Sequence, residues 1–233
     1  MQLLVKQPDP ANWSGPILFD SPFRDLLTNS TRQGRDDASA ISNIFWYASM
    51  AYPLVDTLIS ALAVHQDPEA AWEMFAMTAQ SFAATGFVSA LFVSTIGRGR
   101  PMNDRCLDDP DYSSLCHGVE ANRSFASGHA SFAFTGAGLT CAFHSEMELY
   151  GDGPWGTVAC IGTLATATTT GVLRMVADRH WISDVLVGGG IGFAAGYLLP
   201  KLLHFDYNDD GPNVVMTPWS NGDALGLGLS GTL

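Results

Sequence analysis

The chain has 233 residues, of which 47% are hydrophobic and only 15% charged, so it can bury one sizeable core and is most simply interpreted as a single domain. Its formal net charge is -12, from 23 acidic residues against 11 basic ones. This balance argues against a nucleic-acid partner, because binding to a phosphate backbone needs a basic face. Lys6 and Lys201 are the only lysines in the sequence.

Residues 1–38 are predicted to form an irregular N-terminal arm laid over the surface. The segment is mixed and polar, and prolines at positions 8, 10, 16 and 22 interrupt any regular pattern. Its first residues lack the succession of basic, apolar and small residues that marks a secretory signal, so export by that route is not predicted from the chain as given. Removal of a signal from a longer precursor stays open.

Hydrophobic runs and capping signals predict a series of helices from residue 39 onward. Residues 43–64 are largely apolar, with Asp56 as their only charge. Asp67, Pro68 and Glu69 then supply an N-cap, a first-turn proline and a favourable first-turn charge for a helix that reaches about residue 96. After a polar loop over residues 97–125, three more helices are expected at about 127–147, 154–174 and 181–203.

The last of these helices carries Gly188, Gly192 and Gly196 at four-residue spacing, which places three small positions on one face for close approach of a neighbouring helix. The tail, residues 206–233, has two apolar runs on either side of Asn221-Gly222, which predicts a short β-hairpin. The expected fold is therefore all-α. A compact bundle of about five to six core helices over residues 39–205 should lie between the irregular arm and the tail.

Two predicted helices raise the question of a membrane. Residues 75–96 and 154–173 are each long enough, at roughly 20 residues, to cross a bilayer. Against this, the two helices are rich in Ala, Gly, Thr and Ser. In addition, if the arginine-rich loops faced the periplasm, the cytoplasmic connections would be residues 65–73 and 144–155, which contain no Lys or Arg, against the positive-inside tendency. A compact or peripherally attached envelope protein is slightly favoured, and an integral membrane protein stays open.

The four cysteines fall into two kinds of segment. Cys106 and Cys116 bracket a polar loop whose short span would suit a disulfide in an oxidising compartment, and free thiols are the alternative there. Cys141 and Cys160 lie in apolar runs, so we expect them to be small buried residues without a disulfide.

Two segments offer groups suited to an oxyanion. Gly97-Arg98-Gly99-Arg100-Pro101 could wrap two guanidinium groups around it, although a solvated basic loop end would look the same. In Ser127-Gly128-His129, the serine can cap a helix, the glycine permits close backbone approach, and the helix N-terminus favours an anion. Ser-Gly-His is also a common tripeptide, so this segment alone is a weak signal.

A third segment runs from Arg174 to Asp184. His180 and Asp184 are four residues apart, so on a helix the carboxylate could hold one imidazole nitrogen and free the other. A nucleophilic histidine needs such a partner, because it fixes the tautomer and stabilises the cation formed on attack. An ordinary surface salt bridge would give the same spacing.

Together the three segments resemble the phosphatidic acid phosphatase type 2 and vanadium-dependent haloperoxidase superfamily. That family has Lys, six residues, Arg-Pro; then Pro-Ser-Gly-His; then Ser-Arg, five residues, His, three residues, Asp. The corresponding stretches here are Arg100-Pro101, residues 126–129, and Leu173-Arg174 followed by His180 and Asp184. Their order and internal spacing agree with the family pattern over roughly residues 43–203.

The resemblance implies a role for each matched residue. His180 would attack phosphorus to give a phosphohistidine, oriented by Asp184, while His129 would protonate the leaving oxygen and later activate water. The phosphate oxygens would be held by Arg100, Arg174, Ser127 and Gly128, with Arg98 as a further candidate. No metal or other cofactor is required. Arg179 is interpreted as a rim residue.

Three positions depart from the family pattern. Ala126 replaces the motif proline and Leu173 the motif serine, which could be tolerated because neither supplies the main charge or the nucleophile. Val93 replaces the phosphate-binding lysine, and no lysine lies near it in sequence. Either Arg98 compensates, the substrate is less highly charged, or activity is reduced.

Three functions are therefore considered. The leading one is a phosphatase of the cell envelope, periplasmic or membrane-associated, acting on a phosphorylated small molecule or lipid. A vanadate-dependent haloperoxidase is the second, although the chain is short for that branch. A non-catalytic helical protein that keeps the site for anion binding or structure is the third. Vanadate is expected as an inhibitor in the first case and as a cofactor in the second.

Overall fold

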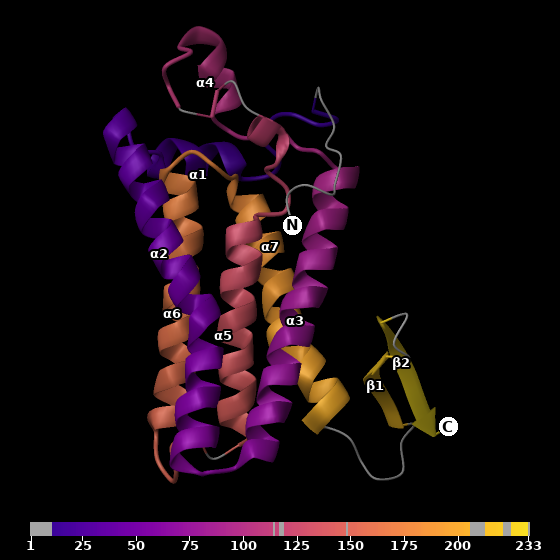
Figure 1. Cartoon of the computed structure of the whole chain (residues 1–233). Coiled ribbons are helices and arrows are strands. Elements are labelled where there is room, and N and C mark those ends of the chain that lie inside the picture. Colours follow the sequence, from indigo (N-terminus) through magenta and orange to yellow (C-terminus); the bar gives the residue numbers. More distant parts are fainter. Residues whose placement is uncertain are drawn as a thin grey trace.

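The computed structural model describes residues 11–113, 115–116, 119–147, 149–205, 213–220 and 225–232. Five long helices form an up-and-down bundle (Figure 1). They are α2 (Arg32–Asp56), α3 (Pro68–Thr95), α5 (Gly128–Glu146), α6 (Trp155–Val176) and α7 (Ile182–Phe193). A π-helical segment, Thr57–Val64, extends α2, and two more, Ala194–Leu198 and Lys201–Phe205, extend α7. These five helices agree with the predicted all-α bundle.

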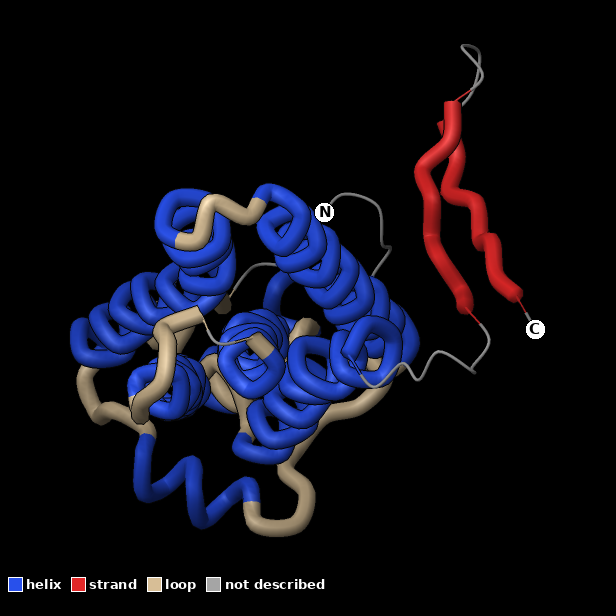
Figure 2. Tube along the Cα trace, turned by 90° about the horizontal axis from the view of Figure 1, so that it is seen from below, coloured by secondary structure: helices blue, strands red, loops and turns tan. Residues whose placement is uncertain are grey.

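Helix α5 is the centre of the bundle. It contacts α2, α3, α6 and α7, and the view along the bundle shows helices packed around a central one (Figure 2). Its buried positions are mostly Ala, Gly, Ser and Thr, so neighbouring helices can approach its backbone closely. Thr85 of α3 and Thr135 of α5 share a hydrogen bond of 2.7 Å between their hydroxyls inside this core.

Two helices begin at the predicted caps. The Asp67 carboxylate accepts hydrogen bonds from the backbone N–H groups of Glu69 and Ala70, at 3.1 and 3.0 Å, and Pro68 opens α3. The Ser127 side chain caps α5 by accepting from the N–H of Ala130. These two cap residues therefore set the first residues of α3 and α5.

The predicted glycine stripe packs against α5. A side chain at Gly188 would overlap the backbone at Ser127, one at Gly192 the carbonyl of Ser131, and one at Gly196 the carbonyl of Thr135. The partners on α5 are also four residues apart, so one face of α7 and its extension runs along one face of α5. This contact holds the start of α7 beside the start of α5.

The N-terminal arm differs from the prediction, because it contains helical structure. Helix α1 spans Asp20–Leu27, and α2 already begins at Arg32. Pro22 lies in the first turn of α1, where its missing N–H costs no helical hydrogen bond. The Thr31 hydroxyl caps α2 by accepting from the N–H of Gly34 at 3.1 Å. Prolines that were expected to exclude helix are thus compatible with a short one.

Both pairs of cysteines form disulfides. The Cys106–Cys116 bond, predicted for the polar loop, has a Cα–Cα distance of 5.4 Å. The loop also contains the short helix α4 (Asn103–Asp108) and a 3-10 turn at Val119–Asn122. The expectation of unpaired thiols at Cys141 and Cys160 was wrong, since these residues are bonded with Cα atoms 4.5 Å apart. Antiparallel packing of α5 against α6 brings them side by side, which spacing in sequence does not reveal.

In the C-terminal tail the structure describes two strands but not the turn between them, so the predicted hairpin stays a prediction. Strands β1 (Asn213–Ser220) and β2 (Leu225–Thr232) pair antiparallel. The proposed turn at Asn221-Gly222 falls outside the described residues.

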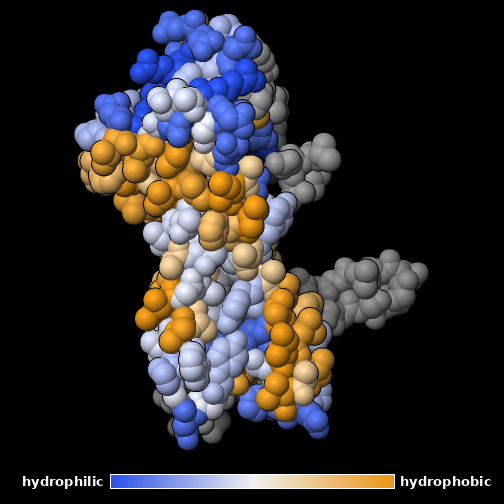
Figure 3. Space-filling view, turned by 90° about the vertical axis from the view of Figure 1, so that its left-hand side faces the viewer, coloured by the Kyte–Doolittle hydropathy of each residue, from blue (hydrophilic) through white to orange (hydrophobic). Residues whose placement is uncertain are grey.

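Four helical segments are long and apolar enough to cross a membrane: Arg32–Val64, Pro68–Thr95, Trp155–Val176 and Ile182–Phe205. Many of their buried residues are small, such as Ser49, Ser81 and Thr85, while large apolar side chains such as Ile44, Leu58, Phe87 and Ile161 are exposed. Hydrophilic side chains gather at one end of the molecule, with hydrophobic patches below them (Figure 3). This distribution suggests membrane association, because a protein surrounded by water rarely exposes so much contiguous apolar surface. The abundance of small residues reflects tight helix packing and does not oppose a membrane.

Two glycines of α7 test the packing against α5. Gly192→Ala should lower the free energy of unfolding by about 1–3 kcal/mol, because the new methyl group meets the Ser131 carbonyl. Gly190→Ala is the matched control, since a Cβ there meets nothing within 4 Å. The control should be neutral or slightly stabilising. Equal thermal stability of the two variants in detergent would contradict this packing.

Candidate active site

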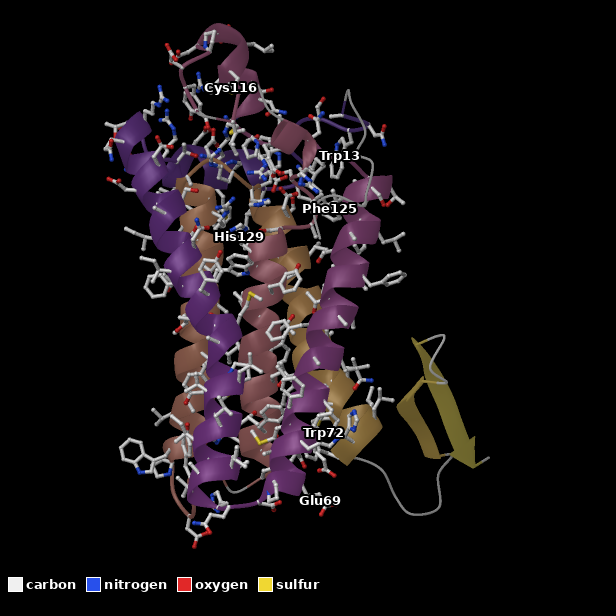
Figure 4. The ribbon with its side chains drawn as sticks, viewed as in Figure 1. Trp13, Glu69, Trp72, Cys116, Phe125 and His129 are labelled. Carbon is white, nitrogen blue, oxygen red and sulfur yellow. A yellow bond between two sulfur atoms is a disulfide. The ribbon has the colours of Figure 1, made fainter. Side chains whose placement is uncertain are left out.

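The three predicted segments lie at one end of the bundle. Helices α3 and α6 end there, and α5 and α7 begin there, so loops far apart in sequence meet (Figure 1). His129 and Phe125 mark this end, and Glu69 and Trp72 mark the opposite one (Figure 4). The up-and-down topology thus gathers the motif residues that stand at helix ends.

Positive charge is concentrated in this region. Arg100, Arg174 and Arg179 are all buried. Burial, together with the charges of Arg179 and Arg123, lowers the pKa of Arg100 to about 10, although Glu120 opposes the change. Arg179 was interpreted as a rim residue, but its guanidinium belongs to this group of charges. Such a group repels itself unless an anion lies between its members.

Several guanidinium donors have no partner within the part of the chain that the structure describes. They are Nε and Nη1 of Arg100 and Nε of Arg174. The remaining contacts are weak: Arg100 Nη2 lies 3.4 Å from Glu120, and Arg174 Nη1 lies 3.3 Å from the Ser39 hydroxyl. Buried donors normally have partners. These arginines can therefore donate to an oxyanion without breaking strong protein contacts.

His180 is held in one tautomer by a backbone carbonyl. Its Nδ1–H donates to the Ser124 carbonyl at 2.8 Å, which leaves the lone pair on Nε2. Burial and the nearby charges of Arg100, Arg174 and His129 lower the pKa of His180 well below its usual value. The imidazole is therefore neutral near pH 7, as a nucleophile must be.

The predicted direct bond between Asp184 and His180 is not made. The carboxylate lies 3.9 Å from Nδ1 of His180, which is an ion-pair distance and too long for a hydrogen bond. The prediction placed both residues on one helix, but His180 precedes α7 and Asp184 lies in its first turn. Asp184 instead accepts from the N–H of Trp181 at 2.9 Å and from the Ser124 hydroxyl. It thereby holds the residue whose carbonyl orients His180.

Arg98 does not take the position of a phosphate ligand. It is fully buried, and its Nη1 and Nη2 donate to Asp184 and Asp20, each at 2.6 Å. Its guanidinium carbon lies 4.1 Å from the ring centroid of Trp13 and 5.2 Å from that of Trp181. Nε alone lacks a partner among the described residues. Arg98 therefore forms two structural ion pairs, and this makes it a weak candidate to replace the missing lysine.

His129 contacts two residues of α2 that the sequence did not single out. Its Nε2 lies 2.9 Å from the Asn43 side-chain oxygen, and its ring centroid lies 4.7 Å from that of Trp46. The oxygen can only accept, so Nε2 carries the proton in this bond. No short motif marks Asn43 or Trp46, because they lie about 85 residues earlier on a helix that packs against α5.

Ser127 and Gly128 lie where α5 begins. The Ser127 N–H donates to the Asp184 carbonyl at 3.1 Å, and its hydroxyl accepts from Ala130, which leaves the hydroxyl hydrogen available to a ligand. A Cβ on Gly128 would meet nothing within 4 Å, so space lies in front of that backbone. Both features suit an anion at the helix N-terminus.

Val93 lies in α3 and is partly buried. Neither lysine replaces it from elsewhere in the described residues: Lys6 falls outside them, and Lys201 pairs with Glu146 at 2.7 Å on α5 near the other end of the bundle. A cavity of about 420 Å³ lies beside these segments, between α1, the start of α2 and the α4 loop. Its walls include Arg24, Arg35 and Tyr112, and none of the predicted site residues.

Comparison with known proteins supports the motif resemblance. Over 81 residues, 35% of this chain, the protein is 44% identical to a lipid A 1-phosphatase of Porphyromonas gingivalis, matching 16% of that protein. Over 171 residues, 70% of this chain, it is 29% identical to a probable diacylglycerol pyrophosphate phosphatase 1 of Schizosaccharomyces pombe, matching 55% of it. The chain thus spans about half or less of these relatives. No solved structure matches the chain.

The family match covers all three segments. The model of the PAP2 superfamily matches residues 75–207, which contain Arg100, His129, Arg174 and His180. The chain belongs to the PAP2 superfamily.

Proposed function

We propose that the protein is a phosphatase that hydrolyses a lipid phosphate through a phosphohistidine intermediate. The observation that carries the proposal is the group of buried guanidinium donors on Arg100 and Arg174 around a neutral His180. The donors suit the oxygens of a phosphate, and the Nε2 lone pair suits attack on its phosphorus.

The reaction divides into two displacements at phosphorus. In the first, Nε2 of His180 forms a bond to phosphorus while the bond to the leaving oxygen breaks. His129, which takes up a second proton when the phosphate anion binds among the arginines, gives a proton to that oxygen and becomes neutral. In the second, His129 takes a proton from water, the water oxygen bonds to phosphorus, and the bond to His180 breaks. Arg100, Arg174, the Ser127 hydroxyl and the Gly128 N–H stabilise the charge on the other oxygens.

The substrate is expected to be a membrane lipid. The names of both relatives specify lipid substrates, lipid A and diacylglycerol pyrophosphate. The site also lies at one end of a bundle whose helices expose apolar side chains. The Cys106–Cys116 disulfide suits an oxidising compartment. The Cys106–Cys116 loop belongs to the same end as the site, so this end is assigned to the outer side of a cell-envelope membrane.

Arg179 is proposed to supply the charge that the lysine provides elsewhere in the family. It adds to the positive potential at Arg100, and its own contacts are loose, with Asp36 at 3.7 Å and the Met102 sulfur at 3.7 Å. Arg98 is engaged by two carboxylates and cannot move to a phosphate without leaving both unpaired.

Substitution of the nucleophile is the first test. His180→Ala should abolish hydrolysis of a lipid phosphate in mixed micelles, because no other side chain in the proposed mechanism attacks phosphorus. Asp184→Asn should leave a residual rate, since it weakens the support of Ser124 but retains the imidazole. His204→Ala is the matched control, because that histidine bonds Gln80 far from the site. If a folded His180→Ala variant hydrolyses the lipid phosphate as fast as the wild type, the hydrolysis does not depend on this site. The non-catalytic function would then remain.

Vanadate binding tests the role of Arg179. Arg179→Gln should weaken the affinity for vanadate, a phosphate analogue, and Val93→Lys in that background should restore part of it, provided the amine reaches the site. Arg105→Gln, an exposed arginine of the α4 loop, controls for loss of general charge. If Arg179→Gln binds vanadate as tightly as the wild type, the proposed replacement of the lysine is wrong.

Arg98→Ala separates the structural from the ligand-binding role of Arg98. Removing it leaves two buried carboxylates, Asp20 and Asp184, without their cation, so the free energy of unfolding should fall by about 3–5 kcal/mol. Val93→Lys should not restore that loss. A normally stable Arg98→Ala protein that only binds vanadate weakly would instead assign Arg98 to the phosphate.

A further inference from the structure

Helix α1 and the residues before it present an apolar side to the surroundings. Leu18, Phe19, Phe23 and Leu26 are 85%, 43%, 39% and 77% exposed. We call these four residues the apolar face of α1. Phe19, Phe23 and Leu26 recur at the spacing of one helical side and form a stripe, and Leu18 lies in the turn that leads into α1. Large apolar residues at this density on an eight-residue helix call for a partner.

The opposite side of α1 is fixed to the protein. Asp20 is fully buried; its carboxylate accepts from Arg98 at 2.6 Å and from the N–H of Ser183 at 3.0 Å. Burial raises the pKa of Asp20, but hydrogen bonds from Ile17, Arg98 and Ser183 outweigh this effect and hold the pKa below its usual value. A charged anchor of this kind prevents α1 from rotating to bury its apolar face.

A second attachment lies one turn later. Arg24 forms a bidentate pair with Asp178, at 2.9 and 2.8 Å, and Leu27 packs beside Ile182. The third side of the helix carries Ser21 and Asp25, which are exposed, and Asp25 lines the cavity beneath the α4 loop. Helix α1 therefore has one side toward the protein, one toward water and one that is apolar.

The place of α1 in the fold identifies what covers the apolar face. The helix runs across the bundle axis where the long helices meet the hydrophilic end (Figure 1). A hydrophobic patch lies directly below the hydrophilic end and faces outward (Figure 3). Exposed Ile41 and Ile44 of α2 and Val172 of α6, near the same ends of their helices, belong to candidate membrane spans. The apolar face thus continues the surface of the spans at the level of their ends.

We propose that α1 is an interfacial helix, whose apolar face lies in the headgroup and acyl boundary of the lipid bilayer on the side of the site. A helix with separate apolar and polar sides, lying across the spanning direction, is the form that binds in this plane. The proposal rests on the membrane location assumed under the proposed function. It assigns the apolar face to lipid and not to a second copy, because four side chains fall short of the about 800 Å² per partner that stable dimers bury.

The attachment of α1 gives this contact a consequence for the site. Asp20 holds Arg98, and Arg98 holds Asp184, so the depth of α1 in the bilayer sets the height of the motif residues above it. Because α1 lies at the boundary, Arg100 and His180 are brought to the level at which the phosphate of a lipid headgroup occurs. Helix α1 is a positioning element in this scheme and does not contact the reacting atoms.

Spin labels measure the depth of α1 directly. The full chain carrying Leu26→Cys or Phe23→Cys is labelled with a nitroxide and reconstituted in phosphatidylcholine vesicles containing phosphatidylglycerol. The four native cysteines are disulfide-bonded, so the introduced thiol is the one that reacts. Accessibility of the label to oxygen, which concentrates in lipid, is compared with accessibility to a water-soluble nickel chelate.

Two matched controls place labels on the same end of the protein but toward water. Asp25→Cys lies on the polar side of α1, and Leu107→Cys lies on α4, where the leucine is 86% exposed. The expected result is a higher ratio of oxygen to nickel accessibility at positions 23 and 26 than at 25 and 107. Equal ratios would overturn the proposal, as would spin–spin coupling between labels at Leu26 in two copies. The measurement needs no turnover, so loss of the phosphatase proposal would leave its outcome interpretable.

Discussion

The arrangement of this protein depends on one buried cation. The Arg98 guanidinium lies between Asp20 and Asp184, 2.6 Å from each, with Trp13 and Trp181 over its faces. A buried charge is costly unless it is paired and hydrogen-bonded, and here both carboxylates share it. The interaction joins the N-terminal arm, the end of α3 and the start of α7, which are separated by more than 70 residues along the chain.

The same ion pair explains how the site is oriented. Asp184, held by Arg98, accepts from the Ser124 hydroxyl, and the Ser124 N–H donates to the Arg98 carbonyl at 2.9 Å. The Ser124 carbonyl is thereby fixed where it receives Nδ1–H of His180. The carboxylate of the family motif acts on the imidazole through a neighbour. In contrast, Nε and Nη1 of Arg100 and Nε of Arg174 lack partners among the described residues, and on this difference we propose that these two arginines, and not Arg98, bind the phosphate.

The sequence predicted the parts of the fold that are encoded locally. Asp67 and Ser127 cap helices as expected, the glycines of α7 meet α5, and the order of the motifs predicted the family. Contacts between distant segments were not predictable in this way. No local pattern pairs Arg98 with Asp20, Cys141 with Cys160, or His129 with Asn43, because each pair forms only when helices pack. For the same reason the sequence did not predict that Arg179 lies near the charge of Arg100, because the two residues are far apart along the chain.

The central claim, that His180 forms a covalent bond to phosphorus, is most directly tested by trapping. The protein is mixed with a lipid phosphate carrying radioactive phosphorus and quenched in alkali, in which phosphohistidine survives, and the labelled peptide is identified. The mechanism predicts label on the peptide containing His180 and none in His180→Ala. Turnover by the wild type without label on His180, or with label on His129, would contradict it.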